Sequence, residues 1–131
     1  MNRIAIVEDD QGYRDTLFIY IKQYEQERDT AFEATPFEKA DDFLAVYNGD
    51  YDIILMDIMM PKMDGHQAAK AIRAMYADRP DAEEIPIIAL SANAFSEDVQ
   101  ASQDAGMNGH VSKPLNMEEV TKVIERNLNR P

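Results

Sequence analysis

The sequence predicts an α/β fold, with a doubly wound, five-stranded, mostly parallel sheet covered by helices on both faces. Apolar runs alternate five times with amphipathic stretches, the pattern of repeated strand–helix units. Three runs, Ile4–Val7, Ile53–Met56 and Ile87–Leu90, are almost continuously apolar, which is typical of central strands buried on both faces. The length of 131 residues and the 45% apolar content indicate one domain with a real core, over residues 1–131.

The N-terminal part is predicted to contain three strands and two helices. The strands are the apolar runs Arg3–Val7, Ala31–Thr35 and Tyr51–Met56, of which the second is short and weak. The helices are Asp15–Tyr24 and Lys39–Tyr47, because apolar side chains recur at helical spacing along one face of each.

The C-terminal part is predicted to contain three helices and two strands. A polar loop at residues 76–84 is predicted between its first helix and its first strand. The predicted elements are helix Gly65–Met75, strand Ile85–Leu90, helix Ser96–Ala105, strand Gly109–Ser112 and helix Asn116–Leu128. Ser96 is the expected N-cap of its helix, and Asn116 with Glu119 predicts a capping box.

The composition restricts the classes of partner. The formal net charge of −12 would repel phosphate backbones, so we expect no direct nucleic-acid partner. The chain has no cysteine, which excludes disulfides and Cys-based zinc sites. The apolar stretches are too short to cross a membrane, and the N-terminus does not resemble a signal peptide. We therefore expect a cytoplasmic protein without a membrane segment.

Five polar residues follow predicted strands: Glu8 and Asp9, Asp57, Ser91, and Lys113. The carboxyl ends of parallel strands meet at one edge of a sheet, where ligands of such folds bind. An ionisable carboxylate next to a buried strand costs free energy unless it is neutralised or used. Convergence of the three acids would favour a magnesium or manganese ion, since their donors are all oxygens.

Each candidate also has a structural interpretation. Glu8 and Asp9 would equally fit an acid cluster favoured by a helix N-terminus. Asp57 is a candidate phosphoryl-accepting nucleophile or a cap of the next turn. Ser91 is a candidate donor to a phosphoryl oxygen or an ordinary strand-end serine. Lys113 is a candidate phosphoryl contact or a lone surface lysine, and Pro114 after it restricts its backbone and is a candidate cis proline.

Four segments together resemble the response-regulator receiver domains of two-component signalling. They are V-E-D-D at 7–10, I-I-L-M-D-I-M-M-P-K-M-D-G at 53–65, I-P-I-I-A-L-S-A-N-A at 85–94 and S-K-P at 112–114. The resemblance covers essentially the whole chain. It implies the flavodoxin-like (βα)5 fold with strand order 2-1-3-4-5.

The resemblance also implies roles for the strand-end residues. Asp57 would be the phosphoacceptor, and the ligands of Mg2+ (or Mn2+) would be Asp9, Glu8, Asp57 and the backbone carbonyl of Met59. Ser91 and Lys113 would bind the phosphoryl group, and Ser91 would move toward it as a switch. His110 stands where the family often has a Tyr or Phe switch residue; it is smaller, titrates near neutral pH, and would otherwise be a half-covered strand residue. His66 is expected to face solvent.

The implied function is that of a signalling switch rather than a conventional enzyme. A sensor histidine kinase or phosphotransfer domain would donate the phosphoryl group, and the surface formed by the last two helices and last strand would change. A downstream effector or fused output domain would read that change, and a homodimer is a further candidate; no DNA-binding domain is expected after the last helix.

Three alternatives remain. The first is a receiver-fold scaffold that is never phosphorylated. A haloacid-dehalogenase-like phosphatase would require an acid where Met59 stands, and a flavin binder would require a phosphate loop where residues 8–10 are acidic.

Overall fold

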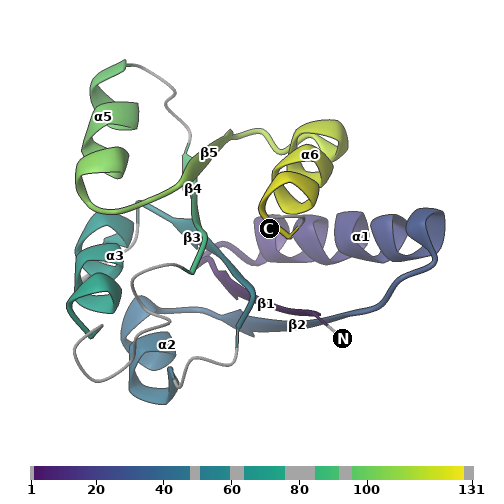
Figure 1. Cartoon of the computed structure of the whole chain (residues 1–131), viewed down its shortest axis with the longest axis horizontal. Helices are drawn as coiled ribbons and strands as arrows, with labels where there is room; N and C mark the ends of the chain where they lie inside the picture. The colour runs from purple at the N-terminus through teal and green to yellow at the C-terminus, as the bar shows by residue number, and fades with distance from the viewer. Residues whose placement is uncertain (1, 48–50, 60–63, 76–84, 92–95, 129–131) are drawn as a thin grey trace.

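The computed structural model is a five-stranded parallel sheet in the order β2-β1-β3-β4-β5, with helices on both faces (Figure 1). The structure describes residues 2–47, 51–59, 64–75, 85–91 and 96–128. Both the α/β class and the strand order 2-1-3-4-5 are therefore confirmed. None of the helices described is long and apolar enough to cross a membrane.

Strands and helices alternate along the chain. The strands are β1 (Asn2–Val7), β2 (Phe32–Phe37), β3 (Ile53–Asp57), β4 (Ile87–Ser91) and β5 (Gly109–Ser112). The helices are α1 (Gln11–Arg28), α2 (Ala40–Val46), α3 (Gly65–Ala74), α5 (Ser96–Asp104) and α6 (Met117–Leu128).

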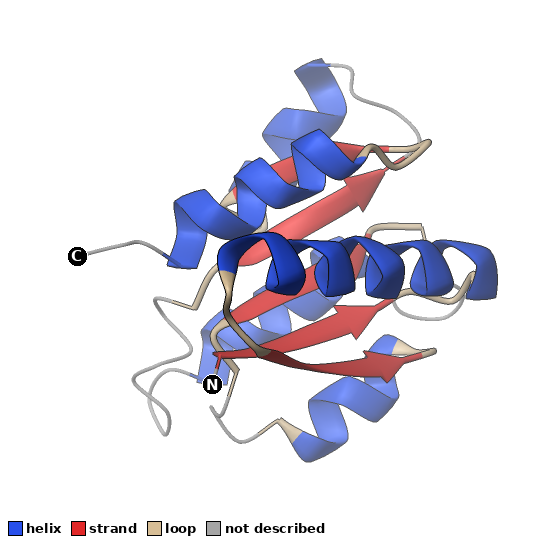
Figure 2. Ribbon diagram, turned by 90° about the vertical axis from the view of Figure 1, so that its right-hand side faces the viewer, coloured by secondary structure: helices blue, strands red, loops and turns tan. Residues whose placement is uncertain are grey.

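The sheet separates two apolar cores. On one face, α1 and α6 pack against the sheet through buried side chains such as Leu17 and Ile124. On the other face, α2 and α3 pack through buried side chains such as Phe43 and Ile72. Figure 2 shows α1 and α6 in front of the strands, with the remaining helices behind. The three apolar strands β1, β3 and β4 lie in the centre, where both faces are covered, as their composition predicts.

Helix α1 is longer at both ends than the predicted Asp15–Tyr24. It starts after Asp10, whose carboxylate accepts a hydrogen bond from the Tyr13 N–H at 3.0 Å and caps the helix. It ends at Asp29, which adopts a left-handed conformation with φ of 48°. The apolar periodicity identified only the buried middle of the helix, because the first and last turns are largely exposed.

Strand β2 also extends beyond its predicted end, through Pro36 to Phe37. Proline has no N–H to donate to a neighbouring strand. This is tolerated here because β2 is an edge strand, with a neighbour on one side only. At α6, Asn116 accepts a hydrogen bond from the Glu119 N–H at 3.1 Å, as the capping box predicts. The Glu119 carboxylate, however, accepts from the Ser112 N–H at 3.2 Å, so it ties β5 to α6.

Some sequence predictions fall outside the described residues. They concern the loop at 76–84 and the side chain of Ser96, the expected N-cap, which is the first residue of α5. At α3, the structure adds a capping box, in which Asp64 accepts from the Gln67 N–H and the Gln67 side chain accepts from the Asp64 N–H.

Gly65 is the point where α3 approaches the end of β3. A Cβ atom at this position would lie 2.5 Å from the Asp57 backbone oxygen and 2.8 Å from the Ile58 Cα. We expect Gly65→Ala to destabilise the fold by about 1–3 kcal/mol, because backbone atoms must separate to make room. Urea unfolding measures the change.

Gly12→Ala is the matched control for Gly65→Ala. A Cβ atom at Gly12 would meet a single side-chain atom, the Asp10 Oδ1 that caps α1, at 3.1 Å, so a shift of a few tenths of an ångström that keeps the cap is enough. A Gly65→Ala variant as stable as wild type would show that the approach of α3 to Asp57 is not tight.

Candidate functional site

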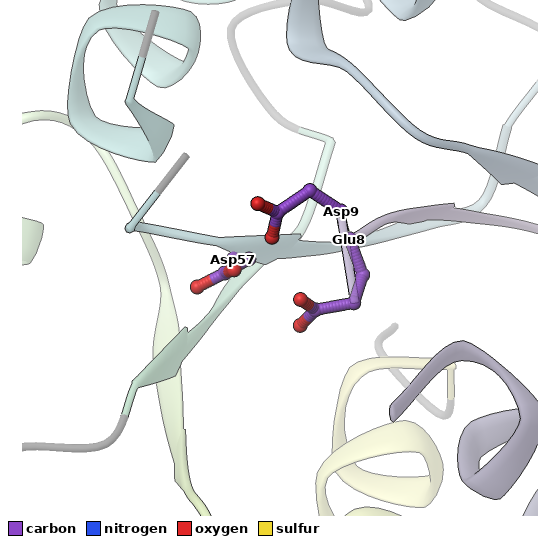
Figure 3. A group of neighbouring side chains, drawn as sticks. All are labelled: Glu8, Asp9 and Asp57. Atoms are coloured by element: carbon purple, nitrogen blue, oxygen red, sulfur yellow. The ribbon is translucent and has the colours of Figure 1, made fainter. Parts of the chain in front are cut away.

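Three carboxylates meet at the carboxyl edge of the sheet. Glu8 and Asp9 follow β1, and Asp57 is the last residue of β3. Because Val7 pairs with Met56 in the parallel ladder, the two strands end side by side. Oxygen atoms of the three side chains lie within 4.8 Å of one another (Figure 3). Glu8 and Asp57 are buried and Asp9 is more exposed, so the cluster can be reached from solvent through Asp9.

Lys113 brings a positive charge to these acids. Its Nζ lies 2.9 Å from Oε2 of Glu8 and 3.4 Å from Oδ2 of Asp57. Its backbone N–H donates to the Ser91 carbonyl oxygen at 2.7 Å, which holds the end of β5 against the end of β4. The Lys113–Pro114 peptide bond is cis. With a side chain only 9% exposed, Lys113 is a buried cation and not a surface lysine.

The second oxygen of Asp57 is held by the backbone. Oδ1 accepts a hydrogen bond from the Met59 N–H at 3.0 Å, so Oδ2 is the oxygen that faces Lys113. Glu8 is held in a similar way, since its Oε1 accepts from the Asp10 N–H at 3.2 Å. Each buried carboxylate therefore has one oxygen on the backbone and one on the ammonium.

Ser91 lies at the same edge as the acids. It is the last residue of β4, it is buried, and it pairs with Ser112 of β5. Asp57 pairs with Leu90, the residue before Ser91, across the β3–β4 ladder. The structure thus places all five polar residues predicted from strand ends at one edge of the sheet.

The charges in the cluster are not balanced. Burial raises the pKa of Glu8 to about 8, with a further contribution from Asp57 and a partial offset by Lys113. Burial also raises the pKa of Asp57, against the lowering effect of Glu8, of the Met59 N–H and of Lys113. Burial alone would lower the pKa of Lys113, but Glu8 and Asp57 raise it above its ordinary value. Two buried carboxylates thus share one ammonium, and an added cation would favour their ionised forms.

The raised pKa of Glu8 predicts a pH-dependent stability in chelator. Between the ordinary pKa of 4.5 and the folded value of about 8, the folded chain holds a proton that the unfolded chain has lost. The free energy of unfolding should therefore decrease as the pH rises through this window, and be largest below it. The decrease is at most a few kcal/mol, since one pKa unit corresponds to about 1.4 kcal/mol.

Urea unfolding at several pH values, with Glu8→Gln as the control, isolates this contribution from that of other groups. The glutamine variant cannot titrate at position 8, so its stability should decrease less over the same window. Identical pH profiles for the two proteins would contradict the assignment.

The comparison with protein families decides the class. The family model described as the response regulator receiver domain matches residues 4–125. The chain belongs to this family. The resemblance carried by the four sequence segments is thereby confirmed, and the domain is a receiver domain of two-component systems.

Relatives of this receiver domain include both regulators and kinases. The transcriptional regulatory protein RprY of Bacteroides fragilis is 36% identical over 128 residues, which are 98% of this chain and 50% of that protein. The sensor protein GacS of Pseudomonas syringae is 38% identical over 80 residues, which are 61% of this chain and 9% of that protein. The receiver domain thus spans half or less of these relatives.

Solved structures share its fold. The receiver domain of a sensor histidine kinase from Pseudomonas aeruginosa, which has a magnesium ion coordinated in its active-site cleft, is 27% identical, with a TM-score of 0.82 and coverage of 98% of both chains. A chemotaxis protein of Vibrio cholerae is 22% identical, with a TM-score of 0.79 and coverage of 98% of this chain and 99% of the other.

Two histidines of the receiver domain lie near α5. His110 in β5 is half-buried, and its Nε2 is buried without a hydrogen-bond partner among the described residues. It lines a cavity of about 210 Å³ together with Val99, Ser102 and Met107. The prediction that His66 faces solvent is wrong, because its Nε2 lies 2.9 Å from Oγ of the buried Ser102 and links α3 to α5.

Two further residues of the site were not identified from sequence. Arg14 donates from Nη1 to the backbone oxygen of Glu8 at 2.7 Å. The ring of Tyr13 lies over Lys113, with 4.3 Å between Nζ and the ring centroid. Both residues lie in the first turns of α1. They were missed because the helix predicted from the sequence starts at Asp15 and not at Gln11.

Proposed function

We propose that this receiver domain is a phosphorylation-dependent switch that accepts a phosphoryl group on Asp57. The donor is a phosphohistidine of a sensor kinase or a phosphotransfer domain. The observation that carries the proposal is the position of Lys113 Nζ, which lies 3.4 Å from Oδ2 of Asp57 and 2.9 Å from Oε2 of Glu8. That geometry leaves a carboxylate oxygen facing a cation at the edge of the sheet where ligands bind.

The chemistry requires positioning and positive charge. In the ionised state Oδ2 of Asp57 attacks phosphorus, the bond between phosphorus and the donor histidine nitrogen breaks, and that nitrogen keeps the electron pair. No general base is needed, because the attacking carboxylate carries no proton. Charge builds up on the phosphoryl oxygens, and the Lys113 ammonium is placed to stabilise it. The buried Ser91 is the proposed hydrogen-bond donor to a phosphoryl oxygen.

The donor set fits a magnesium or manganese ion. The acids Glu8, Asp9 and Asp57 offer only oxygen ligands within 4.8 Å of one another, which hard divalent cations prefer. These acids, with the Met59 backbone carbonyl, are the residues that would hold Mg2+ (or Mn2+). When bound, the ion would supply the positive charge that two carboxylates and one ammonium lack. The magnesium ion coordinated in the Pseudomonas aeruginosa receiver domain supports this proposal.

The proposed readout is a change of the surface formed by α5, β5 and α6. Ser91 ends β4 beside β5, so its movement toward a phosphoryl group would reach that surface through the β4–β5 ladder. His110 in β5 is the candidate switch residue, and its cavity beneath α5 gives the imidazole space to move. The proposed reader is a downstream effector, a fused output domain or a second copy of the chain. We also propose that residues 1–131 form a single receiver domain and that this receiver domain is located in the cytoplasm.

The test is the intact mass of the chain after incubation with a small phosphodonor. With magnesium present, we expect the gain of one phosphoryl group, and with excess chelator we expect little or none. A folded, magnesium-bound protein that gains no phosphoryl group would instead support the scaffold alternative.

Met59 predicts a long-lived phosphoryl form. Its side chain is 71% exposed next to Asp57, and a thioether cannot orient an attacking water. Met59→Asn should accelerate phosphate release by roughly tenfold or more, since a positioned polar group contributes less than full general-base catalysis, which typically contributes about 100-fold to 10,000-fold. A phosphate-release assay measures both rates, and decay of the wild-type form within seconds would contradict the prediction.

A further inference from the structure

The ring of Tyr13 covers the ammonium of Lys113. Nζ lies 4.3 Å from the ring centroid, within the range of a cation–π contact. The same Nζ forms the ion pairs with Glu8 and Asp57. Contacts from α1, from the end of β1 and from the end of β3 thus converge on one nitrogen, which leaves the Lys113 side chain 9% exposed.

The backbone of Tyr13 is itself fixed next to the acidic cluster. The Tyr13 N–H donates to Oδ1 of Asp10 at 3.0 Å. The Asp10 N–H in turn donates to Oε1 of Glu8 at 3.2 Å. The helix cap that starts α1 therefore sets the position of the ring relative to the carboxylates. A side chain that extends from a fixed backbone is better able to hold its partner in place.

The contacts of Lys113 respond differently to a bound cation. Its attraction to Glu8 and Asp57 depends on their negative charge, which a divalent cation in the cluster would neutralise. The same cation would also repel the ammonium. The attraction of the Tyr13 ring depends on its quadrupole, which the cation does not neutralise. The ring is thus the contact that persists when the ion pairs weaken.

We propose that Tyr13 is a positioning residue, whose ring keeps Lys113 Nζ facing Asp57 when a divalent cation occupies the acidic cluster. The inference rests on the proposed phosphoryl-accepting function. It predicts that phosphoryl acceptance and magnesium binding respond differently in a variant that lacks the ring. Phosphoryl acceptance becomes slower, because the ammonium is no longer held in place. Magnesium binding is unchanged or tighter, because a repelling charge can now move away.

The experiment compares Tyr13→Leu, which removes the ring, with Tyr13→Phe, which keeps it. Tyr13→Gln repeats the removal with a polar side chain in case the leucine variant folds poorly. Three quantities are measured on the full chain. They are the rate of phosphoryl acceptance from a small phosphodonor, the magnesium affinity by calorimetry, and the rate at which a limiting amount of an amine-reactive reagent acylates Lys113. Lys22, whose side chain is 75% exposed, is the internal reference for acylation in peptide mass spectra.

For Tyr13→Leu we expect acceptance to fall by roughly threefold to thirtyfold, the range that a cation–π contact contributes. We also expect no loss of magnesium affinity, and faster acylation of Lys113 relative to Lys22 with magnesium bound. Tyr13→Phe should stay within about twofold of wild type in all three, since it retains the ring face. General damage to the site would instead weaken magnesium binding along with acceptance.

Several results would overturn the inference. They are wild-type acceptance in Tyr13→Leu, an equal loss in Tyr13→Phe, or weaker magnesium binding in the leucine variant. A wild-type chain that accepts no phosphoryl group would refute the proposed function, not the role of the ring. In that case acylation of Lys113 decides: faster acylation in Tyr13→Leu supports the inference, and an unchanged rate overturns it.

Discussion

Asp57→Asn is expected to abolish phosphoryl acceptance completely. The amide is nearly isosteric with the carboxylate and its oxygen can keep the hydrogen bond from the Met59 N–H, but an amide oxygen is too weak a nucleophile to attack phosphorus. The loss should appear at every donor and magnesium concentration in an intact-mass measurement, because more donor or more magnesium cannot replace the missing nucleophile.

The same substitution should stabilise the fold in chelator. Asp57 and Glu8 are two buried carboxylates that share the Lys113 ammonium, and the proximity of Asp57 contributes to the raised pKa of Glu8. Removal of one charge leaves a single carboxylate paired with Lys113. We expect a gain of about 1 kcal/mol or more near pH 8, the equivalent of about one pKa unit.

Asp52→Asn is the matched control for Asp57→Asn. Asp52 is an exposed acid just before β3, so the chemical change and the strand are the same but the site is left intact. Its carboxylate accepts from the Arg3 N–H at 2.7 Å, a bond that the amide oxygen can also accept. An Asp57→Asn protein that still gains a phosphoryl group would place the acceptor elsewhere.

Lys113→Met has the second large effect, on both stability and acceptance. The thioether keeps most of the buried volume but leaves Glu8 and Asp57 without their cation. In chelator near pH 8, removal of one partner of a buried ion pair should destabilise the fold by roughly 3–5 kcal/mol. The penalty should shrink as the pH falls below about 8, the pKa of Glu8, because a protonated Glu8 no longer needs a cation beside it.

Acceptance by Lys113→Met should fall by about a hundredfold or more, as when one preorganised group that stabilises developing charge is lost. Magnesium should bind this variant more tightly than wild type, because the repelling ammonium is gone. Lys122→Met is the control: its ion pair with Glu118 is exposed, at 66% and 75%, so we expect a change under about 1 kcal/mol. Equal effects of the two substitutions would contradict the central role of Lys113.

The fold and the strand-end residues could be predicted because local pattern determines them. An apolar run followed at once by an acid, as at Asp57, indicates both a buried strand and its carboxyl end. Parallel strands then bring such ends to one edge without any further information. Glu8, Ser91 and Lys113 were located by the same argument.

The remaining features depend on contacts that no local pattern reveals. The start of α1 at Gln11 follows from a cap by Asp10, whereas the apolar spacing begins one turn later. The ring of Tyr13 meets Lys113 only because α1 and the end of β5 are neighbours in the folded chain. His66 was expected to face solvent as a polar residue early in a helix, but the buried Ser102 of α5 is its partner.

The most direct test of the central claim is to identify the residue that carries the phosphoryl group. After incubation with phosphodonor and magnesium, sodium borohydride reduces an aspartyl phosphate to homoserine, and peptide mass spectrometry locates the change. We expect homoserine at position 57, and none there when magnesium is chelated. Modification at another residue, or none in a folded and magnesium-bound protein, would contradict it.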